Sequence, residues 1–99
     1  NMQTVKSVIL DISGGGIRFS LRTPLEEGAY FMAQFSLALE ESTQQFNIVC
    51  KVISCTPALD HTDRYFARSK FIFDRMTERE KIVRFVFEEE RRIRRREME

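Results

Sequence analysis

The sequence predicts a mainly β protein: a small antiparallel β-barrel with one helix at its C-terminal end. Apolar and polar residues alternate over several short segments that turn residues separate, and only the last quarter of the chain changes to helical spacing. Strands joined by turns, without the helices that connect parallel strands, favour an antiparallel barrel or sandwich. The 99 residues match one domain, 1–99, and a hydrophobic fraction of 42% is typical of a globular chain.

The first two strands are predicted on either side of a glycine turn. Apolar and polar residues alternate over residues 4–12, where Ile9 and Asp11 fall on one face, and again over residues 17–22. Because residues two apart in a strand share a face, the second stretch predicts a half-buried strand. Glycines 14–16 supply the backbone freedom of a tight turn, so the two strands are expected to form a hairpin.

Three longer strands are expected after a loop marked by Pro24 and Gly28. Residues 30–39, 46–55 and 64–73 all alternate, and most of the nine phenylalanines of the chain occupy alternating positions. Phenylalanines spaced in this way are more typical of a core than of a surface on which ligands stack. These segments are therefore expected to supply most of the barrel and its core.

One helix is predicted from about Thr77 to Arg95. Thr77 and Glu80 have the spacing of a capping box, in which each side chain bonds the backbone amide of the other residue. Acidic residues at its start and arginines at its end suit the helix dipole. The face expected to pack on the barrel consists of Ile82, Val83, Val86 and Phe87, and the expected ion pairs are Glu80–Arg84, Glu88–Arg92 and Glu90–Arg94.

The charge of the chain gives no general attraction to nucleic acid or to an anionic membrane. There are 16 basic and 15 acidic residues, for a net charge of +1. Five arginines crowd residues 91–96, but residues 88–99 hold five acidic and five basic residues, so the segment is neutral. The arginine run can be a solvated helix end, a contact with a protein partner or with a second copy in a homodimer, or a nucleic-acid contact. Its neutrality disfavours the last of these.

No metal site, cofactor or catalytic centre is expected. Cys50 and Cys55 lie five residues apart in one predicted strand, so their side chains should leave opposite faces and stay unpaired thiols. His61 has Asp60 and Asp63 beside it, but three loop side chains without a fourth ligand are typical of a solvated turn. No nucleophile with a base partner and no phosphate-loop motif is found, so the sequence predicts a binding module.

The most informative segment is the glycine turn with the polar residues that precede it. Asp11, Ser13 and Gly16 stand in the order Asp-x-Ser-x-x-Gly. Two alternatives are open from these residues alone. The two polar side chains can bond only local amides, or they can offer an acceptor and a hydroxyl to a ligand that the glycine backbone allows to come close.

The order resembles the [Asp/Asn]-x-Ser-x-x-Gly motif of PilZ domains, the bacterial receptor modules for cyclic di-GMP. Residues 71–73 and 80–87 also resemble the last strand and the helix of that family, so the resemblance covers nearly the whole chain. It implies a PilZ-like barrel with a nucleotide ligand. The implied contacts to cyclic di-GMP are Asp11, Ser13 and Gly16, with Gly14, Gly15 and Arg18 as further contacts.

One part of the family pattern is not found in these residues. The family carries an Arg-x-x-x-Arg motif and a strand before the Asp-x-Ser motif, whereas ten residues precede Asp11 here and none is arginine. The chain is therefore expected to be an N-terminally incomplete PilZ-like domain. The resemblance implies that those arginines would supply the main charge-assisted grip on phosphate and guanine. The 99 residues alone are thus expected to bind cyclic di-GMP weakly or not at all, and a longer form to bind it.

Three functions follow from these observations. The first is a non-catalytic cyclic di-GMP receptor that signals to motility or exopolysaccharide machinery through a protein effector or an attached domain. The second is a degenerate PilZ-like domain that has lost the nucleotide and binds a protein partner, and the third is an unrelated barrel that binds nucleic acid. No apolar stretch approaches the roughly 20 residues of a membrane span, and no signal-peptide pattern is found, so a cytoplasmic location is expected.

Overall fold

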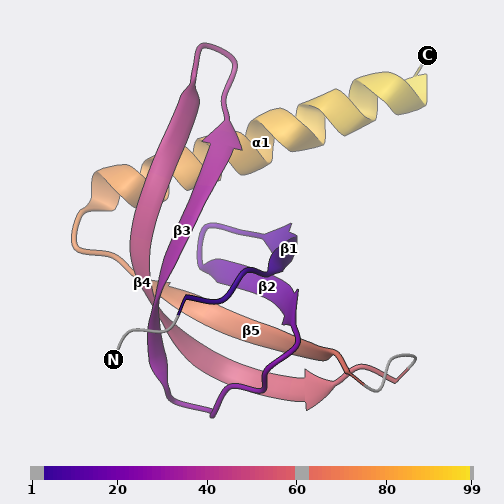
Figure 1. The fold of residues 1–99 in the computed structure, drawn as a ribbon. Helices are drawn as coiled ribbons and strands as arrows, with labels where there is room; N and C mark the ends of the chain where they lie inside the picture. The colour runs from indigo at the N-terminus through magenta and orange to yellow at the C-terminus, as the bar shows by residue number, and fades with distance from the viewer. Residues whose placement is uncertain (1–3, 60–62, 99) are drawn as a thin grey trace.

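The fold comes from a computed structural model, which describes residues 4–59 and 63–98. In this part of the chain one antiparallel sheet has the strand order β1-β2-β5-β4-β3. The elements are β1 (Val8–Ile12), β2 (Gly16–Leu21), β3 (Tyr30–Ala38), β4 (Thr43–Pro57), β5 (Tyr65–Ile72) and α1 (Met76–Met98). Figure 1 shows the sheet curled into a half-barrel, with α1 running across it behind the β3–β4 hairpin. The predicted mainly β, antiparallel architecture with a C-terminal helix is confirmed.

The long strand β4 holds the two parts of the sheet together. Residues 43–51 of β4 pair with β3, and residues 49–57 pair with β5. Strand β5 then pairs with β2, and β2 with β1, so the glycine hairpin between β1 and β2 lies beside β5. The hairpin is therefore positioned by a strand that lies about fifty residues away in the sequence.

The concave face of the sheet forms the hydrophobic core, which α1 covers in part. Its buried side chains come from alternate strand positions, as a period of two requires. They are Ile17, Phe19, Leu21, Ala33, Leu37, Phe46, Ile48, Cys50, Ala67, Phe71 and, from α1, Ile82. The ring of Phe35 stacks on those of Phe46 and Phe71, with centroid distances of 5.3 and 6.0 Å. The assignment of most phenylalanines to the core is confirmed, and Phe66 and Phe87 are the exposed exceptions.

The start of α1 differs from the prediction. The helix begins at Met76 rather than Thr77, which places Thr77 inside the first turn. The amide of Glu78 donates to the carbonyl of Arg75 at 3.3 Å, and no hydrogen bond joins Thr77 to Glu80 in the described part of the chain. The predicted capping box is therefore wrong, because a cap residue must stand before the first helical residue.

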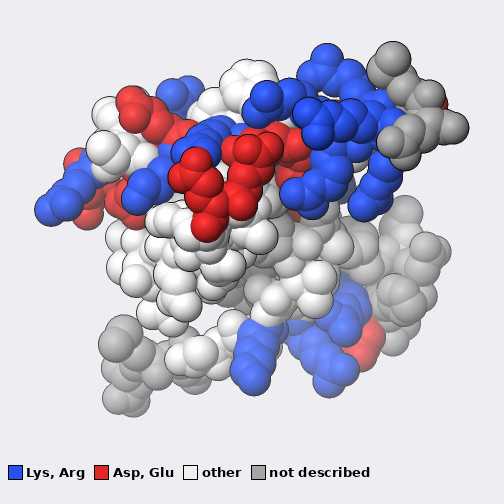
Figure 2. All heavy atoms as spheres, turned by 90° about the horizontal axis from the view of Figure 1, so that it is seen from above, with Lys and Arg blue, Asp and Glu red and all other residues white. Residues whose placement is uncertain are grey.

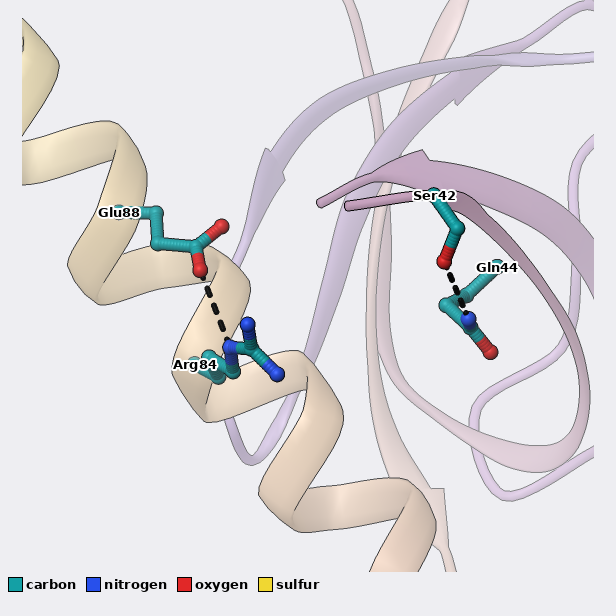
Figure 3. A network of polar contacts seen from close by, with 4 residues as sticks. All are labelled: Ser42, Gln44, Arg84 and Glu88. Carbon is teal, nitrogen blue, oxygen red and sulfur yellow. Dashed lines mark hydrogen bonds and ion pairs between the residues drawn. The ribbon is translucent and has the colours of Figure 1, made fainter. Parts of the chain in front are cut away.

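The ion pairs along α1 also differ from those predicted. Arg84 donates to Glu88 at 3.0 Å, and Arg92 pairs with Glu89 at 2.9 Å. Figure 3 shows the Arg84–Glu88 pair on α1, together with the bond from Gln44 to Ser42 in the β3–β4 hairpin. Glu88 is buried, and the pair with Arg84 gives its carboxylate the partner that a buried charge needs. Within residues 4–59 and 63–98, no helix has the length and apolar character that a membrane crossing needs.

The helix face that packs on the sheet is only partly the predicted one. Ile82 is fully buried and Phe85 packs against the core, whereas Val83 and Val86 are half-buried. Phe87 is 57% exposed, so its assignment to the packing face is wrong. It lies five positions after Ile82, which places it on the far side of a helix with 3.6 residues per turn.

Two β-bulges interrupt the alternation that the sequence suggests. One lies between Ile9 and Asp11 in β1, and the other between Val52 and Ser54 in β4. Because a bulge adds one residue to one strand, side chains beyond it change faces. Ile9 is therefore opposite Phe19 of the core face, whereas Asp11 points outward, and the predicted common face of Ile9 and Asp11 is wrong.

The second bulge corrects the prediction for the cysteines. Cys50 lies opposite Phe71 and Cys55 opposite Ala67, so both side chains are on the core face and not on opposite faces. Both are nonetheless free thiols, as expected. Burial raises the pKa of the Cys50 thiol to about 11, although a hydrogen bond with Ser69 acts in the other direction.

Candidate functional site

The Asp-x-Ser-x-x-Gly segment forms the turn that joins β1 to β2. The amide of Ser13 donates to the carbonyl of Gly16 at 3.0 Å, and the Ser13 hydroxyl accepts from the amides of Gly15 and Gly16, both at 3.3 Å. A longer contact of 3.4 Å joins the hydroxyl to the carbonyl of Gly16. Ser13 therefore shapes the turn through local hydrogen bonds, and its side chain remains exposed at the surface.

The three glycines of the turn have three different surroundings. A Cβ on Gly16 would overlap the backbone of Ser69 in β5, and one on Gly14 would lie 2.8 Å from Cγ2 of Val83 in α1. A Cβ on Gly15 would meet nothing closer than the Ser13 hydroxyl at 3.9 Å. Gly16 thus permits close pairing with β5, Gly14 permits close packing on α1, and Gly15 leaves open space beside the turn.

The bulge in β1 gives Asp11 its outward direction. Without the extra residue, Asp11 would share the core-facing side of Ile9, where a carboxylate would need a buried partner. With it, Asp11 lies opposite Arg18 of β2 on the convex face, and both side chains are exposed. Bulges of this kind commonly redirect a side chain beside a binding site.

An open groove of about 490 Å³ lies on the convex face beside the hairpin. Residues of β1, β2, β4, β5 and the turn line it: Asp11, Ser13, Gly15, Gly16, Ile17, Arg18, Ile53, Arg68, Ser69 and Lys70. Five of the six residues that the sequence singled out for the ligand are in this lining. Gly14 is not, because it faces α1.

Five residues of the groove lining were missed by sequence reasoning, namely Ile17, Ile53, Arg68, Ser69 and Lys70. Arg68 and Lys70 come from β5, and Ile53 is the extra residue of the bulge in β4. The alternation of residues 64–73 did place Arg68 and Lys70 on the polar face of their strand. Nothing in the sequence indicated that β5 pairs with β2, and this pairing is what brings the two cations to the hairpin.

The groove lies in the charged part of the sheet. The five strands contain four basic residues and one acidic residue, Asp11. Three of the four basic residues line the groove, namely Arg18, Arg68 and Lys70. Figure 2 shows a different pattern over α1, where acidic side chains occupy the middle and basic ones gather towards the C-terminal end. Although the net charge of the chain is near zero, the sheet has a local excess of positive charge, which attracts anions.

A family model for the PilZ domain matches residues 1–88. The chain belongs to the PilZ domain family. The match covers the glycine hairpin, the whole sheet and the first half of α1. The comparisons with curated proteins and with solved structures give no significant match.

Membership in the PilZ family relates the groove to a known class of ligand. PilZ domains as a family bind cyclic di-GMP and act as non-catalytic receptor domains through protein effectors. The residues that match the family motif, Asp11, Ser13 and Gly16, all line the groove of this PilZ domain. The other residues that line the groove are not among the three defined positions of the motif.

Two other features of this PilZ domain could suggest a site, but neither gives a candidate within the described residues. A hollow of about 520 Å³ follows α1, but every residue that lines it belongs to α1, so it is the outer surface of a helix. Within residues 4–59 and 63–98, no cluster of His, Cys, Asp and Glu could hold a metal ion. Asp60 and His61, which the sequence placed beside Asp63, lie outside the described residues.

Proposed function

We propose that this PilZ domain is a cyclic di-GMP receptor module and that it binds the nucleotide in the groove beside the β1–β2 hairpin. One observation supports this above the others. The exposed carboxylate of Asp11 and the hydroxyl of Ser13 meet the cations Arg18, Arg68 and Lys70 around one open groove. A ligand with hydrogen-bond donors on its bases and negative charge on its phosphates complements that arrangement.

The chemistry of guanine suits the hairpin side of the groove. The Watson–Crick edge of guanine presents N–H donors, which the Asp11 carboxylate can accept, and the Ser13 hydroxyl can bond a base edge or a phosphate. The open space beside Gly15 lets a flat ring approach the backbone. Cyclic di-GMP offers two guanines and two phosphates, so one molecule can use both the acceptors and the cations.

The output of the module is part of the same proposal. A receptor without a catalytic centre must act through a protein effector or an attached domain, and motility and exopolysaccharide machinery are the proposed targets. The helix α1 is the proposed contact for an effector or for a second copy in a homodimer, because residues 90–97 are all exposed. A cytoplasmic location fits a nucleotide second messenger.

Calorimetric titration with cyclic di-GMP tests the proposal. We expect a form with an Arg-x-x-x-Arg motif upstream of Asp11 to bind, and Asp11→Ala in that form to weaken binding by about tenfold or more, because it removes a charged hydrogen-bond acceptor. Asp63→Ala is the matched control, since Asp63 is an exposed aspartate outside the groove. Equal affinities for the two variants would contradict the assigned site.

A comparison with a longer form tests the expected contribution of the family's arginine motif. The 99-residue chain is expected to bind cyclic di-GMP more weakly than a form with an Arg-x-x-x-Arg motif upstream of Asp11. Tight binding by the 99 residues that the longer form does not exceed would contradict this expectation.

A second candidate is a degenerate PilZ domain that binds a protein partner in place of the nucleotide. The observation that favours it is the exposed apolar edge of the sheet. Val8 and Leu10 of β1 are 58% and 46% exposed, and an edge strand offers unpaired backbone groups to another chain. A titration of the longer form with no heat and no saturation at millimolar cyclic di-GMP would favour this candidate over the first.

A further inference from the structure

We infer that Arg18, Arg68 and Lys70 form the phosphate-binding part of the groove, so that β5 supplies ligand contacts outside the Asp-x-Ser-x-x-Gly motif. The inference rests on the proposed function, because it assigns the charged part of the same ligand. Asp11 and Ser13 would then bind a base, and the three cations would bind one phosphodiester unit.

The sheet register places the three cations close together. Arg18 of β2 lies directly opposite Arg68 of β5, and Lys70 lies opposite Gly16. Side chains directly opposite on neighbouring strands have Cβ atoms about 5 Å apart, and residues two apart on a strand share a face. The side chains can therefore converge on one phosphodiester unit.

None of the three cations forms an ion pair within the described residues, although Asp11 lies opposite Arg18 across β1 and β2. Like charges directly opposite in a sheet repel and destabilise it. The ion pairs in the described residues are both on α1, and Asp11 is the one acidic residue on the five strands. An arrangement that costs stability in the free protein and is relieved by a bound anion is typical of a binding site.

The neighbours of the cations leave room for the rest of a nucleotide. Gly16, opposite Lys70, has no side chain that would fill the groove, and Ile53 is turned into it by the bulge in β4. Ile53 is 49% exposed, and a base or ribose can pack against its apolar side chain. The groove thus joins acceptors, cations and one apolar contact within a single surface.

The fourth basic residue of the sheet lies outside this arrangement. Lys51 is opposite Lys70 across β4 and β5, but it is not in the groove lining. Its ammonium lies 5.6 Å from the ring centroid of Tyr30, which is a cation–π distance. Lys51 therefore offers a matched control: a neighbouring lysine on the same face with a different partner.

Titration of four variants with cyclic di-GMP, at low and at high sodium chloride, tests the inference. Arg68→Ala and Lys70→Ala are each expected to weaken binding by about tenfold, because each removes a charge-assisted hydrogen bond. Arg68→Lys should recover most of the loss, and Lys51→Ala should change the affinity by no more than about twofold. The dependence of affinity on salt should be smaller in the two alanine variants of β5 than in the unmodified chain.

Thermal unfolding without ligand separates binding from folding. Because Arg68 faces Arg18, Arg68→Ala is expected to keep or raise the melting temperature while it lowers the affinity. Binding by the unmodified chain that Arg68→Ala and Lys70→Ala leave unchanged would overturn the inference and leave the proposed function standing. Failure to bind at millimolar ligand, both by the 99-residue chain and by a form with an Arg-x-x-x-Arg motif upstream of Asp11, would overturn both.

Discussion

At the scale of single residues, the glycine turn shows that one motif serves folding and binding together. Gly16 allows β2 to approach β5, and this approach carries Arg68 and Lys70 to the hairpin. The amide of Phe71 donates to the carbonyl of Gly15 at 2.8 Å and ties the turn to the end of β5. A change at Gly16 should therefore damage the sheet before it affects any direct ligand contact.

Gly16→Ala tests this structural role. The added methyl group would overlap the backbone of Ser69, which cannot move without disturbing the β2–β5 pairing. We expect a loss of about 1–3 kcal/mol in the free energy of unfolding, as for other forced insertions into packed sites. Urea unfolding followed by circular dichroism measures it.

Gly15→Ala is the matched control, because a methyl group there meets no atom closer than 3.9 Å. Its free energy of unfolding should stay within about 0.5 kcal/mol of the unmodified chain. Equal losses for the two variants would show that loss of glycine flexibility, and not the contact with β5, sets the cost.

The sequence indicated which polar residues stand at the glycine turn, but it did not always predict on which face of a strand a side chain lies. Asp11 and Ser13, which the motif singled out, both line the groove. The alternation that placed Ile9 and Asp11 on one face does not hold, because a bulge after Ile9 turns Asp11 outward. A bulge leaves no clear signal in the sequence, since it depends on how the two strands pair.

At the scale of elements, α1 shows which part of an amphipathic pattern decides the packing. The helix was predicted in nearly the right place, since its periodicity is local information. Its packing face is set by where the sheet ends, so Ile82 is buried, whereas Phe87 and Ile93 are 57% and 51% exposed. Only the first half of α1 is therefore expected to contribute to the stability of the fold.

Alanine substitutions along α1 test this division. Ile82 is fully buried, so Ile82→Ala should lower the free energy of unfolding by about 2–4 kcal/mol through lost burial and the cavity left behind. Ile93→Ala removes the same atoms from an exposed position and should cost less than about 0.5 kcal/mol. Denaturant unfolding of both variants measures the difference, and a large cost at Ile93 would mean that the second half of α1 packs on something in solution.

At the scale of the whole molecule, basic residues are separated from acidic ones on the sheet but are mixed with them on α1. The sheet carries four basic residues against one acidic residue, while the arginines at the end of α1 are matched by its glutamates. Composition could not predict this separation, because a net charge of +1 is compatible with any distribution. The separation predicts that a small anion and a long polyanion will be bound differently.

Binding of cyclic di-GMP and of a single-stranded RNA of about 20 nucleotides, compared by fluorescence anisotropy, tests this distinction. Cyclic di-GMP has two phosphates, so its affinity should fall only modestly between 50 and 300 mM salt, with a logarithmic slope of no more than about 2. The RNA would have to contact many phosphates, but the acidic residues of α1 oppose the basic ones there, so we expect no measurable binding at about 150 mM salt. Strong RNA binding with a steep salt slope, unaffected by excess cyclic di-GMP, would show that the arginine-rich end of α1 acts as a nucleic-acid contact of its own.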